Sequence, residues 1–170
     1  MSLAHDLLDQ ASALARLDPK KPKQASLRRA VSAAYYALFH LLVEEAARLF
    51  VRDDFTRAAL IGRTFDHIKM KEVSGHFLGD DLPERIRSKP AYQTPAELKV
   101  VAEALIKLQQ HRHEADYNLD RQFRRSEVQE LIRDVEIAFT NWEIVRNTDD
   151  ARMYLACFLL WDTWKKSPKG

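Results

Sequence analysis

One segment, Ser26 to Phe50, constrains the fold more than any other part of the sequence. It reads SLRRAVSAAYYALFHLLVEEAARLF, and its apolar residues recur at the three- and four-residue spacing of one helix face. Four alanines form a narrow side where another helix can approach closely: Ala30, Ala33, Ala34 and Ala37. A helix that is apolar over so much of its girth is typical of the central member of a helical bundle.

Composition agrees with a helical protein of one domain. The chain has 170 residues, only four glycines and six prolines, and many of the residues that favour helices. The net charge of +2 permits a phosphate or nucleic-acid ligand without indicating one. We therefore predict an all-α fold, an up-and-down bundle of about five to seven helices around the long central one, with residues 1–170 as a single domain.

The remaining helices are predicted from the same periodicity. An opening helix, Leu3 to Leu17, should end at Asp18-Pro19, because a residue before proline avoids helical geometry. Capping signals predict further starts: Asp53-Asp54 before residue 55, Thr94-Pro95-Ala96-Glu97, Ser126-Glu127-Val128-Gln129, and the run from Asn147 to Asp150. Another helix is expected over about Thr64 to Phe77, followed by a long irregular stretch over 78–93.

The last helix and the cysteine content bear on location and partners. The middle of ARMYLACFLLWDTWKK is apolar nearly all round, which predicts either a buried packing helix or a subunit interface. Cys157 is the only cysteine, so no intrachain disulfide can form and a reducing compartment is expected. The N-terminus has no continuous apolar stretch, and no run is long enough to span a membrane. We expect a cytoplasmic protein that does not contact membranes.

Two polar groupings could carry chemistry. Ser32, Tyr36, His40 and Glu44 are spaced by four on the central helix, so Tyr36 and His40 are neighbours, while Ser32 and Glu44 drift apart around the axis. This group is either a polar edge beside the core or one half of a site.

The second grouping is His111-Arg112-His113-Glu114-Ala115-Asp116-Tyr117-Asn118. It is either a solvated helix end or a site for phosphate recognition and acid–base cleavage of RNA. Its two histidines diverge, and too few ligands converge for a metal, so we predict no metal and no cofactor. The basic residues Arg28, Arg29, Arg121, Arg124 and Arg125 could extend an electrostatic footprint. No phosphate-binding glycine loop, GxSxG, HExxH or CxxC occurs.

LRRAVSAAYYALFHLL, followed later by RTFDHIKMK and LQQHRHEADYNL, resembles the HEPN family in its bacterial single-domain branch. The resemblance spans roughly residues 24 to 145. It implies a helical bundle, often a homodimer, associated with RNA. Many members are metal-independent endoribonucleases of toxin–antitoxin or defence systems, so a cognate antitoxin or a nucleotidyltransferase-like protein is a candidate partner.

The nuclease members of that family carry an arginine followed by a histidine after four to six residues. Arg112 matches the arginine, but the histidine positions fall on Tyr117, Asn118 and Leu119. His113, next to Arg112, or His40 would have to serve as the base.

Three functions follow from these patterns. The first is a HEPN-like RNA- or nucleotide-associated module of uncertain catalytic competence, with Arg112 and His113 as candidate catalytic residues. Its candidate binding residues are Tyr36, His40, Asp116, Tyr117 and Asn118. The second is a metal-independent endoribonuclease, and the third is a non-catalytic protein-interaction subunit that uses the apolar last helix.

Overall fold

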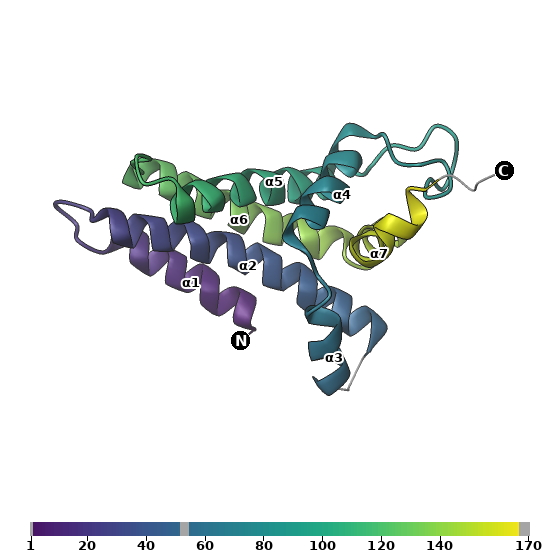
Figure 1. The fold of residues 1–170 in the computed structure, drawn as a ribbon, viewed down its shortest axis with the longest axis horizontal. Helices are drawn as coiled ribbons and strands as arrows, with labels where there is room; N and C mark the ends of the chain where they lie inside the picture. The colour runs from purple at the N-terminus through teal and green to yellow at the C-terminus, as the bar shows by residue number, and fades with distance from the viewer. Residues whose placement is uncertain (1, 52–54, 167–170) are drawn as a thin grey trace. The chain divides into compact units, whose positions relative to one another are not determined.

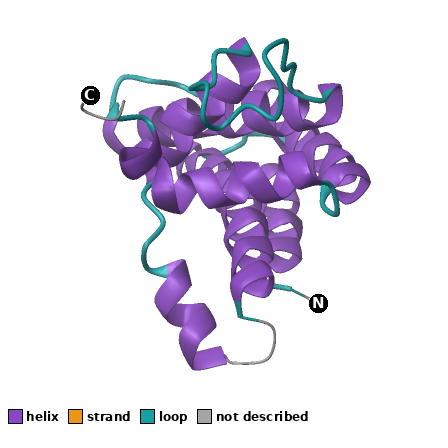
Figure 2. Cartoon of the chain, turned by 90° about the vertical axis from the view of Figure 1, so that its right-hand side faces the viewer, coloured by secondary structure: helices purple, strands orange, loops and turns teal. Residues whose placement is uncertain are grey.

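The computed structural model describes residues 2–51 and 55–166, and within them it contains seven helices and no strand (Figures 1 and 2). The prediction of an all-helical bundle with a long second helix is confirmed. In chain order the helices are α1 (Leu3–Arg16), α2 (Gln24–Phe50), α3 (Phe55–Gly62), α4 (His67–Gly79), α5 (Ala96–Tyr117), α6 (Arg125–Val145) and α7 (Asp149–Trp164).

The chain divides into two compact units. The first consists of Met1–Leu41 and Ala104–Thr140, and the second of Leu42–Glu103 and Asn141–Gly170. The first unit therefore holds α1, most of α2, the C-terminal part of α5 and most of α6, while the second holds α3, α4 and α7. The prediction of a single domain over residues 1–170 stays a prediction.

In the first unit, the backbone conformation of Asp18, the residue before Pro19, ends α1. Asp18 adopts a left-handed conformation, with φ of 55°, which turns the chain out of the helix. The backbone carbonyls left unpaired there are taken up by the guanidinium of Arg125, which donates to the carbonyl oxygens of Ala15, Leu17 and Asp18 at 3.0, 3.1 and 2.7 Å. An arginine from α6 thus closes the end of α1.

The start of α4 corrects the prediction that this helix begins near Thr64. The helix begins at His67, because the carboxylate of Asp66 accepts the N–H of Lys69 at 2.8 Å and caps the first turn. Asp53 and Asp54, which we expected to cap the preceding helix, lie outside the described residues.

Two predicted capping boxes are formed differently. At α5, the N–H of Thr94 donates to Asp80 Oδ1 at 2.8 Å, where the capping box would place the Glu97 carboxylate. The helix of the second box begins at Arg125, one residue before Ser126, so the prediction that Ser126 caps it is wrong. There, Glu127 Oε2 lies 3.5 Å from the N–H of Arg124 and caps the helix from its first turn.

In the second unit, α7 packs against α4 through its apolar middle. Tyr154, Phe158 and Trp161 are all buried, and the hydroxyl of Tyr154 lies 2.7 Å from Ser74 Oγ in α4. Thr148 caps α7 as predicted, accepting the N–H of Ala151 at 3.2 Å. These three aromatic residues of the last helix are therefore buried, as the alternative of a packing helix predicts.

The irregular stretch after α4 is anchored by its apolar side chains. The helix runs on to Gly79, two residues past the predicted end, and Asp80 follows it in a left-handed conformation with φ of 57°. Leu82, Ile86 and Tyr92 are buried although they belong to no helix of the structure. Core packing therefore holds this segment, together with a backbone turn in which the N–H of Ile86 donates to the Pro83 carbonyl at 2.9 Å.

Candidate functional site

Four polar side chains of α2 and α5 meet within the first unit, and we call this set the Arg112 cluster: Ser32, Tyr36, Arg112 and Asp116. Arg112 Nη2 donates to the Tyr36 hydroxyl at 3.1 Å, and Ser32 Oγ donates to Asp116 Oδ1 at 2.8 Å. Arg112 Nε lies 2.7 Å from Asp116 Oδ2, an ion pair by distance whose N–H is not aligned for a hydrogen bond. The carboxylate is thus shared between a hydroxyl and a guanidinium.

Aromatic rings line one side of this guanidinium. Arg112 Cζ lies 5.5 Å from the centroid of the Tyr36 ring and 5.9 Å from that of Tyr35, within the range of cation–π attraction. The His40 ring follows one helical turn later, with its centroid 6.3 Å from that of Tyr36. Arg112 is therefore held in place by a carboxylate, a phenol hydroxyl and two ring faces, while its side chain stays 19% exposed.

The antiparallel register of α2 and α5 brings these residues together. Ser32 and Tyr36 are four apart on α2, and Arg112 and Asp116 are four apart on α5, so each pair lies on one face of its helix. Ser32 meets Asp116 and Tyr36 meets Arg112, so the residue number rises on one helix as it falls on the other. Ser32 and Tyr35 were not among the predicted site residues. Matching the two four-residue spacings in antiparallel order would have found Ser32.

The other predicted site residues lie elsewhere. His113 and Tyr117 are exposed on α5, and their rings contact each other at a tilt of 47°, with centroids 5.1 Å apart. Asn118 ends the helix, and its side-chain oxygen accepts the N–H groups of Asp120 and Arg121 at 3.1 and 3.2 Å. Of the seven predicted residues, the structure brings Tyr36, Arg112 and Asp116 together, with His40 beside Tyr36.

Three of the five arginines that we considered for an electrostatic footprint are used inside the protein. Arg28 and Arg125 each donate to backbone carbonyls at helix ends, as detailed for Arg125 above. Arg121 pairs with Glu114 and Glu127 and stacks on Phe123, with its Cζ 4.4 Å from the ring centroid. The remaining two, Arg29 and Arg124, are exposed, and no described residue accepts from their guanidinium groups.

His111, the first residue of the predicted cluster, points away from Arg112. Its Nδ1 lies 3.7 Å from Glu114 Oε2 and 3.9 Å from Glu127 Oε1, beside the Arg121 guanidinium. The hydrogen bond from Gln110 lowers the pKa of Glu114 below its usual range, an effect that outweighs partial burial and that Arg121 reinforces. This second network connects the end of α5 to the start of α6 through charge pairs.

Metal-ligating groups do not gather in the described part of the chain. Among residues 2–51 and 55–166, no set of three or more histidine, cysteine, aspartate or glutamate side chains could hold a metal ion. Within the same residues, no helix has the length and apolar character needed to cross a membrane.

Comparison with models of known protein families, with curated proteins and with solved structures found no match.

Proposed function

We propose that this chain is a HEPN-like module that binds RNA or a nucleotide as a homodimer, with Arg112 as the residue that contacts phosphate. The observation that supports the proposal is the way Arg112 is held. Asp116 and Tyr36 fix the orientation of its guanidinium, and no described residue accepts from its Nη1. A guanidinium fixed in this way loses little freedom when it grips a phosphate.

The surroundings of Arg112 suit a nucleic-acid ligand. Arg29 is exposed and lies seven residues before Tyr36, so two helical turns place both on one stripe of α2. Tyr36 is partly exposed and offers a ring on which a base can stack. Asp116 lowers the net charge of the cluster, so the binding should be moderate and strongly dependent on salt.

The test is RNA binding by alanine variants. We expect a short labelled single-stranded RNA, or a labelled ATP analogue, to bind at low salt in a fluorescence anisotropy titration. Arg112→Ala should weaken binding by about tenfold or more, since a hydrogen bond to a charged group contributes about 1.5–3 kcal/mol. Arg124→Ala, which removes an exposed and unpaired arginine, is the matched control. Equal affinities of these two variants, or no binding by the wild-type protein, would refute the proposal.

A metal-independent endoribonuclease is the second candidate, and one observation favours it. His40 places an imidazole next to Tyr36, the residue that hydrogen-bonds Arg112. In this scheme His40 takes the proton from a ribose 2′-hydroxyl, and the 2′-oxygen attacks the adjacent phosphorus. The bond from phosphorus to the 5′-oxygen of the next nucleotide breaks, that oxygen takes a proton from solvent, and Arg112 stabilises the charge on the phosphate oxygens. His113 is less well placed, since it is exposed and its ring contacts Tyr117.

This candidate requires RNA cleavage in EDTA that leaves 2′,3′-cyclic phosphate ends. His40→Ala should abolish it and His113→Ala should not. Cleavage that survives Arg112→Ala and His40→Ala would identify a contaminating nuclease. Size-exclusion chromatography with light scattering tests the homodimer separately.

A further inference from the structure

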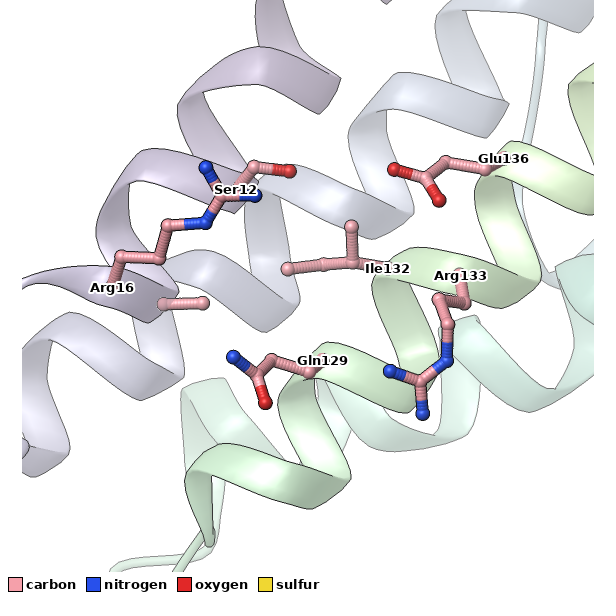
Figure 3. Close-up of a pocket in the computed structure, with 7 residues that line it drawn as sticks. Ser12, Arg16, Gln129, Ile132, Arg133 and Glu136 are labelled. Atoms are coloured by element: carbon pink, nitrogen blue, oxygen red, sulfur yellow. The ribbon is translucent and has the colours of Figure 1, made fainter.

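A groove of about 250 Å³ opens in the first unit between α1 and α6, well apart in sequence from the residues of the Arg112 cluster (Figure 3). Seven residues line it: Ser12, Ala15, Arg16, Gln129, Ile132, Arg133 and Glu136. Figure 3 shows Arg16 on the α1 wall, Arg133 on the α6 wall, and the side chains of Gln129 and Ile132 between them. The groove is smaller than the roughly 300–1,000 Å³ of sites for drug-sized molecules, so it suits a small ligand.

The polar side chains of this groove have no partners within the protein. Five polar side chains line the groove, and none of them forms a hydrogen bond or an ion pair with another side chain or backbone group in the described ranges: Ser12, Arg16, Gln129, Arg133 and Glu136. This differs from Arg28, Arg112, Arg121 and Arg125 of the same unit, whose guanidinium groups all have acceptors. The guanidinium groups of Arg16 and Arg133 are therefore available to an external anion.

The charge and shape of the lining select the ligand. Two arginines and one glutamate give a net charge of +1, which favours an anion. A phosphate monoester carries about −1.5 to −2 at neutral pH and has three acceptor oxygens, so its charge and its acceptors match a lining that holds two guanidinium groups. A single carboxylate has one charge and two oxygens. Ala15 and Ile132, both buried, supply a small apolar floor for the carbon part of the ester.

We propose that the groove between α1 and α6 binds a phosphate monoester dianion, with Arg16 and Arg133 binding its oxygens from opposite walls. Gln129 and Ser12 supply further donors. Glu136 opposes the anion, so it limits affinity and favours a ligand that carries a hydroxyl or amine near the phosphate. The proposal does not rest on the function proposed for the Arg112 cluster.

Isothermal titration calorimetry of the full chain with glycerol phosphate tests it, with glycerol and succinate as comparison ligands. We expect glycerol phosphate alone to bind, and Arg16→Ala and Arg133→Ala each to weaken binding about tenfold. Arg124→Ala, which removes an exposed arginine outside the groove, should bind as the wild-type protein does. No binding of glycerol phosphate, equal binding of succinate, or unchanged affinity in both groove variants would overturn the proposal.

A variant that binds more tightly provides a second test, because an unfolded protein would lose affinity and could not gain it. Glu136→Gln removes the opposing charge and should tighten binding by about threefold or more, because a like charge beside the ligand is unfavourable. Asp120→Asn makes the same change of net charge at an exposed position outside the groove and should leave the affinity unchanged. Equal gains in the two variants would mean that overall charge, and not the groove, governs binding, and the proposal would fail.

Two sources could provide this phosphate, a free small molecule or the 5′ end of an RNA. RNAs that differ only in a 5′-phosphate or 5′-hydroxyl separate them. A 5′-phosphate preference that is lost in Arg16→Ala supports the RNA terminus. Binding of glycerol phosphate with no 5′-phosphate preference supports the small molecule. If neither probe depends on Arg16, the groove is not a phosphate site.

Discussion

Arg28 stabilises the C-terminal end of α5, and its replacement should weaken the first unit. Its Nη1 donates to the carbonyl of Ala115 at 2.8 Å, and its Nη2 donates to the carbonyl of Asn118 at 2.8 Å. The carbonyls of Leu119 and Arg121 also accept from Nη2. These oxygens lie at a helix end and in the loop after it, where the backbone cannot supply intrahelical donors.

The expected loss follows from these contacts. A hydrogen bond to a charged group contributes about 1.5–3 kcal/mol, and a cation at a helix C-terminus about 0.3–1 kcal/mol. Water can reach several of the freed carbonyls, because residues 118–120 are exposed, so the contributions do not simply add. We expect Arg28→Ala to lower the free energy of unfolding by about 2–3 kcal/mol. Arg28→Lys should cost about 1–2 kcal/mol, since it keeps the charge without the fork.

Urea denaturation followed by circular dichroism measures the change in the free energy of unfolding, and hydrogen exchange localises it to the amides of residues 118–121. Arg29→Ala is the matched control, because Arg29 is the next residue, is exposed and has no acceptor among the described residues. It should change stability by less than about 0.5 kcal/mol. If Arg28→Ala and Arg29→Ala are equally stable, or if exchange near residue 118 is unchanged, the capping role is refuted.

Three further predictions concern the second unit. Ser74→Ala should destabilise the protein more than Tyr154→Phe in urea denaturation. The serine variant loses the hydrogen bond from Ser74 Oγ to the Met70 carbonyl, at 2.6 Å, and also leaves the buried Tyr154 hydroxyl unpaired, whereas Tyr154→Phe keeps the bond to Met70. Burial raises the pKa of Cys157 to about 12, so iodoacetamide at pH 8 should modify it in the urea-unfolded chain and spare it in the folded one, as mass spectrometry can measure. The hydrogen bond from Trp161 Nε1, at 2.8 Å, lowers the pKa of Glu72 in the folded protein. The ionised Glu72 carboxylate therefore stabilises the fold at pH values above the ordinary carboxyl pKa, and this stabilisation is lost as the pH falls through the lowered pKa of the folded state. The free energy of unfolding of Glu72→Gln should therefore depend less steeply on pH in the acid range, and an unchanged slope would contradict this.

The helices could be predicted from the sequence because their signals are local. The spacing in residues 26–50 predicted one helix that contains them, and α2 spans Gln24–Phe50. Starts depend on single capping contacts, and these were less secure. Asp66 begins α4 three residues later than predicted, and Asp80, fourteen residues from Thr94, takes the place of Glu97 at α5.

The candidate site was predicted in part. Tyr36, Arg112 and Asp116 were identified by residue type and four-residue spacing, and all three belong to the Arg112 cluster. His113 and Asn118 were identified by the same density of polar residues but take other positions, since neighbours on a helix point about 100° apart. Residue type alone cannot show which residues of one short segment point toward the same site.

The role of each arginine was decided by the tertiary structure alone. In the sequence, Arg28 and Arg29 are adjacent and equivalent, yet Arg28 caps a helix 87 residues away and Arg29 faces solvent. Arg16 and Arg133 are far apart in the chain, yet they line one groove. Helical periodicity depends on interactions within one turn, so the sequence determined the helices and the faces that they bury. The partner of a guanidinium depends on which remote carbonyl or carboxylate packing brings within about 3 Å, and only the folded structure specifies that.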